Sequence, residues 1–261
     1  MFRVTPVASD FAYNYMQFLG DMKKAGHKVD SIAVVNENTD YGTSISGTVL
    51  EAAAKAGLAV AAHIAYSANS TDVSAQVLEL KQKKPDVVIF IGYTNDEILY
   101  MKTLKALDYL PTMIIGDDSG FSDPAFIPAV GDLAEGAINR SAWDVGKPGS
   151  NTYKINEMFK QKTGRDMDDT SGRDMQAFFV LADAINRAGS TDPEKIQKAL
   201  QETALGPERL MMGYRGVKFD ATGQNIEAAT YLIQLHSKAY QAVWPEKSAT
   251  APLQWPMKGW K

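Results

Sequence analysis

Three short segments of this chain, each directly after an apolar run, carry side chains suited to binding a small charged molecule. They are Tyr41, then Tyr93 with Asn95, and then Asp117 with Asp118. A tyrosine offers an apolar ring and a hydroxyl, and a carboxylate can pair with an ammonium group. A small zwitterion or amide would therefore find partners among them. A second interpretation stays open, in which the aspartates cap helices and the tyrosines pack locally.

The apolar runs that precede these residues recur every 26–28 residues. They predict strands at about 31–36, 58–65, 86–91, 112–116 and 136–141. Segments of helical periodicity separate them, and the spacing is close to the roughly 30 residues of a strand–helix–strand unit. We therefore predict an α/β fold with a doubly wound parallel sheet and helices on both faces. Such sheets bind ligands beyond the carboxyl ends of their strands, where the candidate residues stand.

The pattern changes near Asp144. Three helices are predicted at 153–162, 171–188 and 192–200, with no strands of their own, before an extended stretch at 217–220 and a hairpin formed by 230–235 and 239–244. The apolar faces of these helices need a partner surface, because isolated helices are marginal in water. They contain Met158, Phe159, Phe178, Phe179, Leu181, Ile185, Ile196 and Leu200.

Composition excludes several classes of function. The 261 residues are 45% hydrophobic and carry a net charge of -4, which is typical of a globular protein and argues against a nucleic-acid partner. The sequence has no cysteine, which removes disulfides and thiolate chemistry. Phosphate-binding glycine loops are missing, and the histidines lie far apart at His27, His63 and His236. We therefore expect no cofactor and no metal site.

Two features of the chain concern its cellular location. No apolar stretch approaches the roughly 20 residues that a membrane-spanning helix needs. The first residues, Met1–Pro6, lack the apolar core of a signal peptide. The chain is therefore expected either to stay in the cytoplasm or to be an exported protein whose beginning is not included here.

A series of short motifs resembles the type I periplasmic binding proteins, in the Leu/Ile/Val (branched-chain amino acid) branch of ABC-transporter substrate-binding proteins. The matching pieces follow one another along nearly the whole chain. They are Phe2–Pro6, Asp40-Tyr41-Gly42, Gly92-Tyr93, Leu104–Leu107, Gly116-Asp117-Asp118, Gly131–Gly136 and Gly216–Gly223.

The resemblance implies a two-lobed protein of which this chain contains the later part, so that the chain looks truncated at its amino terminus. Residues 1–143 and 217–245 would form the ligand-binding, carboxy-terminal lobe, and 144–216 the helical remainder of an incomplete amino-terminal lobe. Residues 246–261 would form a C-terminal tail. The family's signal peptide and the groups that hold the ligand's carboxylate would lie in the missing part.

The resemblance also implies roles for single residues and a location. Tyr41 and Tyr93 match ligand-contacting tyrosines, and Asp118 aligns with an acidic residue that binds the ligand's ammonium group, where family members often carry Glu. We expect a non-enzymatic, periplasmic solute-binding protein that binds an amino acid or a related small acid or amide and delivers it to a membrane permease. We also expect a homo-oligomer, or a partner chain that supplies the missing part.

Two other functions stay open at this stage. One is an enzyme on the same doubly wound fold, with Asp117 or Asp118 as a base. The other is a self-associating remnant that binds no ligand.

Overall fold

The computed structural model describes residues 1–117, 119–146 and 148–258. It divides into two compact units. We call Ala8–Arg140 with Tyr231–Lys261 the sheet unit, and Met1–Val7 with Ser141–Thr230 the helical unit. Among the described residues, no helix has both the length and the apolar character needed to cross a membrane.

A seven-stranded sheet, in the order β2-β1-β3-β4-β5-β8-β9, forms the centre of the sheet unit. The strands are β1 (Ser31–Glu37), β2 (Ala59–Tyr66), β3 (Val87–Ile91), β4 (Met113–Gly116), β5 (Ile138–Ser141), β8 (Tyr231–His236) and β9 (Ala239–Trp244). Strand β1 pairs in parallel with β2 and β3, β3 with β4, and β4 with β5. This confirms the prediction of five parallel strands in one α/β sheet.

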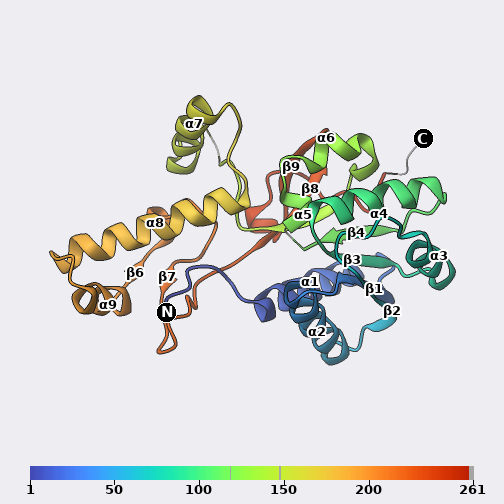
Figure 1. Ribbon diagram of the computed structural model, residues 1–261, viewed down its shortest axis with the longest axis horizontal. Helices are drawn as coiled ribbons and strands as arrows, with labels where there is room; N and C mark the ends of the chain where they lie inside the picture. Colours follow the sequence, from blue (N-terminus) through green and yellow to red (C-terminus); the bar gives the residue numbers. More distant parts are fainter. Residues whose placement is uncertain (118, 147, 259–261) are drawn as a thin grey trace. The chain divides into compact units, whose positions relative to one another are not determined.

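Helices cover this sheet, with α1 and α2 on one side and α4 on the other (Figure 1). The helices of the unit are α1 (Ala8–Lys24), α2 (Asp40–Lys55), α3 (Ser74–Lys83), α4 (Thr94–Ala106), α5 (Ser119–Ser122), α6 (Phe126–Val130) and the 3-10 turn η1 (Gly131–Ala134). Residues of β1, β3 and β4 are almost completely buried, since both faces of a parallel sheet are covered. Their continuous apolar runs reflect that burial.

The hairpin of β8 and β9 closes one end of the sheet, and its antiparallel pairing confirms the predicted hairpin. The 3-10 turn η3 (Glu246–Ser248) begins the C-terminal segment. This segment packs on the same unit: Met257 is buried and donates its N–H to the Thr112 carbonyl at 2.9 Å. Gln254 and Gln234 also exchange hydrogen bonds, with 2.8 Å from the Gln254 N–H to the Gln234 Oε1.

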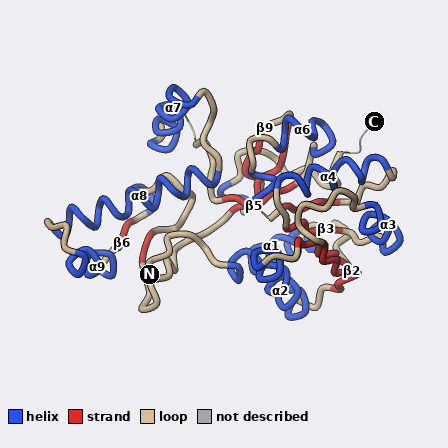
Figure 2. Tube along the Cα trace, viewed as in Figure 1, coloured by secondary structure: helices blue, strands red, loops and turns tan. Residues whose placement is uncertain are grey.

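The helical unit consists mainly of three helices and a small sheet (Figure 2). Its elements are α7 (Asn151–Thr163), α8 (Asp169–Ala188), α9 (Pro193–Gln201), β6 (Ala204–Leu205), η2 (Pro207–Arg209) and β7 (Val217–Lys218). Strand β7 lies in the predicted extended stretch, but it pairs with β6 in an antiparallel sheet, so the prediction that the helices bring no sheet of their own was wrong. The two strands are only two residues long, too short to give a periodic signal.

The chain's first residues lie within the helical unit. The Arg3 N–H donates to the Gly223 carbonyl at 2.8 Å, and the rings of Phe2 and Phe219 lie 5.0 Å apart. Residues 1–7 and 217–230 therefore group with the helices by their contacts, whereas the division based on the sequence groups them with the sheet.

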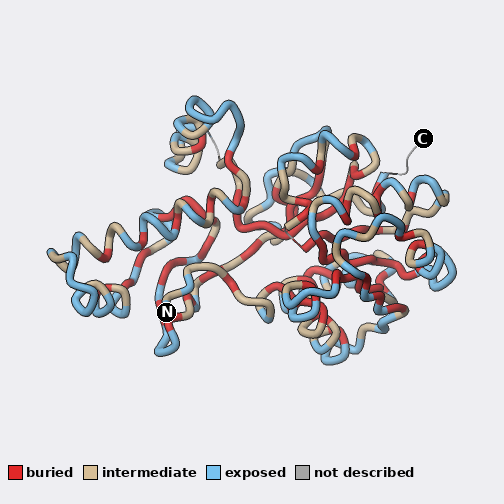
Figure 3. The backbone as a smooth tube through the Cα atoms, in the orientation of Figure 1, coloured by how far each residue is buried: buried red, intermediate tan, exposed pale blue. Residues whose placement is uncertain are grey.

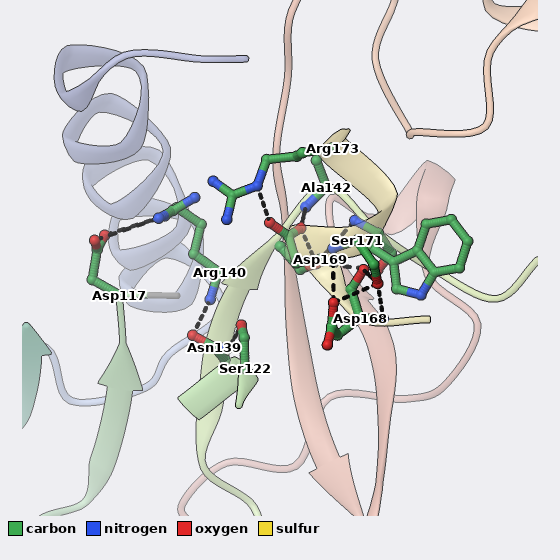
Figure 4. A network of polar contacts seen from close by, with 11 residues as sticks. Asp117, Ser122, Asn139, Arg140, Ala142, Asp168, Asp169, Ser171 and Arg173 are labelled. Atoms are coloured by element: carbon green, nitrogen blue, oxygen red, sulfur yellow. Dashed lines mark hydrogen bonds and ion pairs between the residues drawn. The ribbon is translucent and has the colours of Figure 1, made fainter. Parts of the chain in front are cut away.

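Polar contacts fix the start of α8. Asp168 and Ser171 form a reciprocal capping box, with 2.8 Å from the Ser171 N–H to the Asp168 carboxylate. The neighbouring Asp169 is buried, accepts the Ala142 N–H at 2.7 Å and pairs with Arg173 at 2.9 Å (Figure 4). The capping box satisfies an N–H group that the helix start would otherwise leave without a partner, and Asp169 ties the helix to the segment after β5.

The apolar residues of the helical unit are only partly covered, and exposed and buried turns alternate along α8 (Figure 3). Phe159 and Leu200 pack against the unit's own core. Four large apolar side chains of α7 and α8 are exposed, by 41–62%. They are Met158, Phe178, Phe179 and Leu181.

Candidate functional site

The candidate residues lie at one edge of the sheet, where the parallel strands β1, β3 and β4 end. Tyr41 stands in the first turn of α2, Tyr93 is the N-cap of α4, and Asp117 directly follows β4. The rings of Tyr41 and Tyr93 lie 5.7 Å apart, and the Tyr41 hydroxyl donates to the Asp117 carbonyl at 2.5 Å. The structure thus brings these three residues together. Asp118 lies outside the described residues.

The carboxylate of Asp117 is completely buried and is held by three side chains. The Tyr15 hydroxyl donates to its Oδ1, and the Tyr41 hydroxyl lies 3.1 Å from its Oδ2. The Arg140 Nε donates to Oδ1 at 3.2 Å (Figure 4). Burial first, and then the charge of Asp117, raises the pKa of Tyr15 well above its usual range. Tyr15 therefore stays protonated and keeps donating. This network fixes the position of the Tyr41 hydroxyl.

Arg140 neutralises that buried carboxylate. Its guanidinium is nearly as buried as Asp117 and lies 3.6 Å from the centre of the Phe11 ring. Its backbone N–H donates to the Asn139 Oδ1 at 2.9 Å, and the Asn139 amide donates to Ser122 at 2.8 Å (Figure 4). Asp117 and Arg140 thus form an internal ion pair, so the carboxylate of Asp117 is already engaged inside the protein.

A second buried carboxylate, that of Glu37, shapes the loop that presents Tyr41. Glu37 accepts the backbone N–H groups of Thr39 and Gly42, the latter at 2.6 Å, and the Thr39 hydroxyl at 2.8 Å. It thereby stabilises the start of α2, where free N–H groups favour a negative charge. A Cβ at Gly42 would lie 2.1 Å from the Glu37 carbonyl oxygen, so only glycine fits there.

Tyr93 is one of the exposed candidates. Its side chain is 39% exposed, and its hydroxyl lies 3.4 Å from the Thr39 hydroxyl. Asn95 is also exposed, and its side chain makes no hydrogen bond within the part of the chain that the structure describes. Neither Asn95 nor Thr94 caps α4, because Tyr93 is the N-cap and the Thr94 hydroxyl donates to Asp123 at 2.9 Å.

Two glycines allow the loops around Tyr93 to pass close to one another. A Cβ at Gly92 would lie 2.4 Å from the Tyr66 hydroxyl, and one at Gly120 would lie 2.3 Å from the Glu97 Oε2. The Gly120 N–H also donates to the Gly92 carbonyl, at 3.3 Å. Larger residues at these two positions would push the loop of Tyr93 away from its present place.

Buried acidic groups lie behind this edge of the sheet. Glu37, Asp96 and Glu97 are each at most 1% exposed. Burial first, with a further contribution from Glu37, raises the pKa of Asp96 above its ordinary value. Burial first, and then the charges of Asp96 and Glu97, also raises the pKa of Tyr66 well above its usual range. The concentration of acidic groups favours a ligand that brings a positive charge.

Sequence reasoning missed the supporting residues of this site. Arg140 and Tyr15 reach Asp117 from positions 23 and 102 residues away in the sequence. The role of Glu37 could have been predicted from the sequence, because a carboxylate at a strand end, shortly before a helix, can accept the helix's first N–H groups.

A family model described as "Periplasmic binding protein" matches residues 1–240. The Leu/Ile/Val-binding protein homolog 8 of Brucella abortus (strain 2308) is 30% identical to this chain over 271 aligned positions. That alignment covers 97% of this chain and 65% of the relative, so the chain spans just under two thirds of the relative's length.

Two solved structures resemble this one. The leucine binding protein LivK from Thermotoga maritima MSB8 aligns with a TM-score of 0.78 and 22% identity, over 93% of this chain and 66% of that one. A putative branched-chain amino acid ABC transporter from Silicibacter pomeroyi aligns with a TM-score of 0.81 and 16% identity, over 98% of this chain and 69% of that one. At these identities the likeness concerns the fold.

Proposed function

The chain belongs to the periplasmic binding protein family, and we propose that it is the solute-binding part of an ABC importer for a branched-chain amino acid or a similar small acid or amide. Binding takes place without chemical turnover. The main support is the pair of neighbouring tyrosines, Tyr41 and Tyr93, at the carboxyl edge of the parallel sheet. A relative that covers most of this chain carries a Leu/Ile/Val-binding name.

In this proposal the two tyrosine rings contact the ligand's apolar side chain, and the exposed Tyr93 contributes most of the contact. Asp117 acts through Tyr41 as a positioning residue, because its own carboxylate is engaged with Tyr15 and Arg140. Asp118 is proposed to pair with the ligand's ammonium group, and the exposed amide of Asn95 to form a polar contact at the rim.

The proposal extends to the lobes and the location. The sheet unit is proposed to be the ligand-binding lobe, and α7, α8 and α9 the helical part of a second lobe. That second lobe would supply the groups that bind the ligand's carboxylate. The protein would work in the periplasm and deliver its ligand to a membrane permease, as the family's name and the relatives suggest.

Exposed apolar residues support a further part of the proposal, which concerns partners. Phe178 and Phe179 stand side by side with ring centres 6.0 Å apart, and Met158 and Leu181 are exposed on the same unit. Soluble monomers rarely expose large apolar patches. We therefore propose that these helices are covered by a second copy or by a polypeptide that completes the lobe. Sedimentation as a monomer at micromolar concentration, with the helices ordered, would contradict this part.

A panel of amino acids, read by thermal shift and by mass spectrometry of the ligand, tests the proposed function. Leucine, isoleucine or valine is expected to raise the unfolding temperature while the ligand stays chemically unchanged. A modified ligand would favour an enzyme, and the absence of any shift would favour a remnant that binds nothing.

The ammonium-binding role of Asp118 is tested in a version that carries both lobes. Asp118→Ala is expected to weaken binding by about 2–5 kcal/mol, the cost of breaking a desolvated ion pair. Asp108→Asn, an acidic residue after α4, is the control and should leave affinity unchanged. Unchanged affinity in Asp118→Ala would show that the assigned role is wrong.

A further inference from the structure

A cavity of about 440 Å³ lies entirely within the helical unit, lined by residues of α7, α8 and the segment from β6 to Met211. Its volume falls within the range of small-molecule sites, roughly 300–1,000 Å³. None of its lining residues belongs to the tyrosine site of the sheet unit. The cavity is therefore separate from that site, and the inference requires only that the covering proposed above for these helices leaves the cavity open.

Gln176 gives this cavity an unused hydrogen-bond donor. The side chain is 1% exposed, and its Oε1 accepts the backbone N–H groups of Met211 at 2.9 Å and Met212 at 3.4 Å. Two N–H donors on one amide atom identify that atom as oxygen and fix the orientation of the amide. The Nε2 then donates to no group among the described residues, so it can donate to a molecule in the cavity.

The charges around the cavity favour an anion. Asp183 pairs with the Arg209 guanidinium through Oδ1 and with Arg187 through Oδ2, both at 2.8 Å. Burial alone would raise the pKa of Asp183, but the hydrogen bonds and charges of the two arginines outweigh it and lower the pKa. The carboxylate is therefore ionised and doubly paired. Lys154 lines the same cavity, is exposed and forms no ion pair within the described part of the chain.

The remaining walls are mostly apolar. Ile155 from α7, Phe179 from α8 and Leu205 from β6 line the cavity, and Phe179 is 41% exposed. The cavity thus combines an apolar wall with an amide donor and an unpaired cation. Its acidic side chain, Asp183, already has two partners, so an ammonium group would find no carboxylate there.

We propose that this cavity is a second binding site, for a small carboxylic acid with an apolar body and no amino group. The Nε2–H of Gln176 and the ammonium group of Lys154 bind the carboxylate. Ile155, Phe179 and Leu205 contact the hydrocarbon part. The missing partner for an ammonium group distinguishes this ligand class from the amino acids proposed for the sheet unit.

The test compares two probes with the same carbon skeleton, 4-methylpentanoate and leucine, which differs by its amino group. The full chain is labelled at Ile, Leu and Met methyl groups and titrated with each probe in NMR. We expect 4-methylpentanoate to shift the methyl signals of Ile155, Leu205 and Met211, and leucine to leave them in place. Failure of 4-methylpentanoate to move them, or equal shifts with leucine, would overturn the proposal.

Two variants and a control locate the carboxylate. Lys154→Met removes the cation but keeps the apolar stem, and Gln176→Glu keeps the acceptor for Met211 while replacing the donor by a negative charge. Each is expected to weaken binding about tenfold, as the loss of a charge-assisted hydrogen bond does. Lys162→Met, on the same helix but outside the cavity, should leave affinity unchanged. Equal losses in Lys154→Met and Lys162→Met, or undiminished binding of the neutral 4-methylpentanamide, would contradict the assigned anion site.

Discussion

The sheet unit and the helical unit differ in how far the apolar side chains of their helices are covered. In the sheet unit, helices such as α3 and α4 bury their apolar side chains against the sheet, and Leu80 and Leu104 are fully covered. In the helical unit, one side of α8 is buried, with residues such as Val180, whereas Phe178 and Leu181 on the same helix are exposed. An apolar helix face therefore indicates that the helix packs against another surface, but that surface is not always part of the same chain.

The largest expected effect is a difference in the free energy of unfolding between variants that break a buried ion pair in the sheet unit and a more exposed one in the helical unit. Asp117→Ala should lower the free energy of unfolding by about 3–5 kcal/mol, because it leaves the buried guanidinium of Arg140 without its partner. Arg165→Met breaks the more exposed pair with Asp168, at 3.0 Å, and should cost no more than about 1 kcal/mol. Urea denaturation measures both. Similar losses in the two variants would contradict the difference in burial.

A smaller effect compares two leucines. Leu80→Ala, in α3, should lower the free energy of unfolding by about 3 kcal/mol, since it opens a cavity in the core. Leu181 is 43% exposed in α8, so Leu181→Ala should cost less than about 1 kcal/mol if its face is bare. Urea denaturation of both variants at several protein concentrations makes the comparison. A large, concentration-dependent loss in Leu181→Ala would show that another copy covers this face.

The smallest effects concern pH and have opposite signs in the two units. Burial raises the pKa of Asp96 above 3.8, so the folded state binds the proton more tightly than the unfolded state. Its contribution to stability is therefore present at low pH and is lost as the pH rises through the folded-state pKa. Asp96→Asn should remove this loss, so that the variant gains stability relative to the wild type as pH rises.

Asp168 should behave in the opposite way. Burial alone would raise its pKa, but the hydrogen bonds from Ser171 and the charge of Arg165 lower it below 3.8. Its contribution is present above that value and is lost as pH falls through the folded-state pKa. Urea midpoints of Asp96→Asn and Asp168→Asn across the acidic range measure both. The same pH trend in both variants would contradict the assigned environments.

The sequence predicts the elements well where burial leaves a local pattern. The runs around Ile32 and Val87 are apolar because both faces of the parallel sheet are covered, so the strands could be located within about two residues. Parallel strands end at one edge, which was enough to bring Tyr41 and Tyr93 together. The pairing of Asp117 with Arg140 could not be predicted, because it depends on the three-dimensional neighbourhood of two distant segments. The exposure of Phe178 could not be predicted either, because the local sequence pattern shows that the helix face is apolar but not which surface covers it.

The central claim is that the tyrosine pair at the edge of the sheet binds a branched-chain amino acid, and calorimetric titration of leucine into the full chain tests it most directly. The wild type and Tyr13→Ala, which removes a tyrosine that is 61% exposed on α1, are expected to bind leucine equally well. Tyr93→Ala is expected to bind about tenfold more weakly, since it loses an aromatic contact. Equal binding by Tyr93→Ala and Tyr13→Ala, or no binding of any branched-chain amino acid by the wild type, would contradict the account.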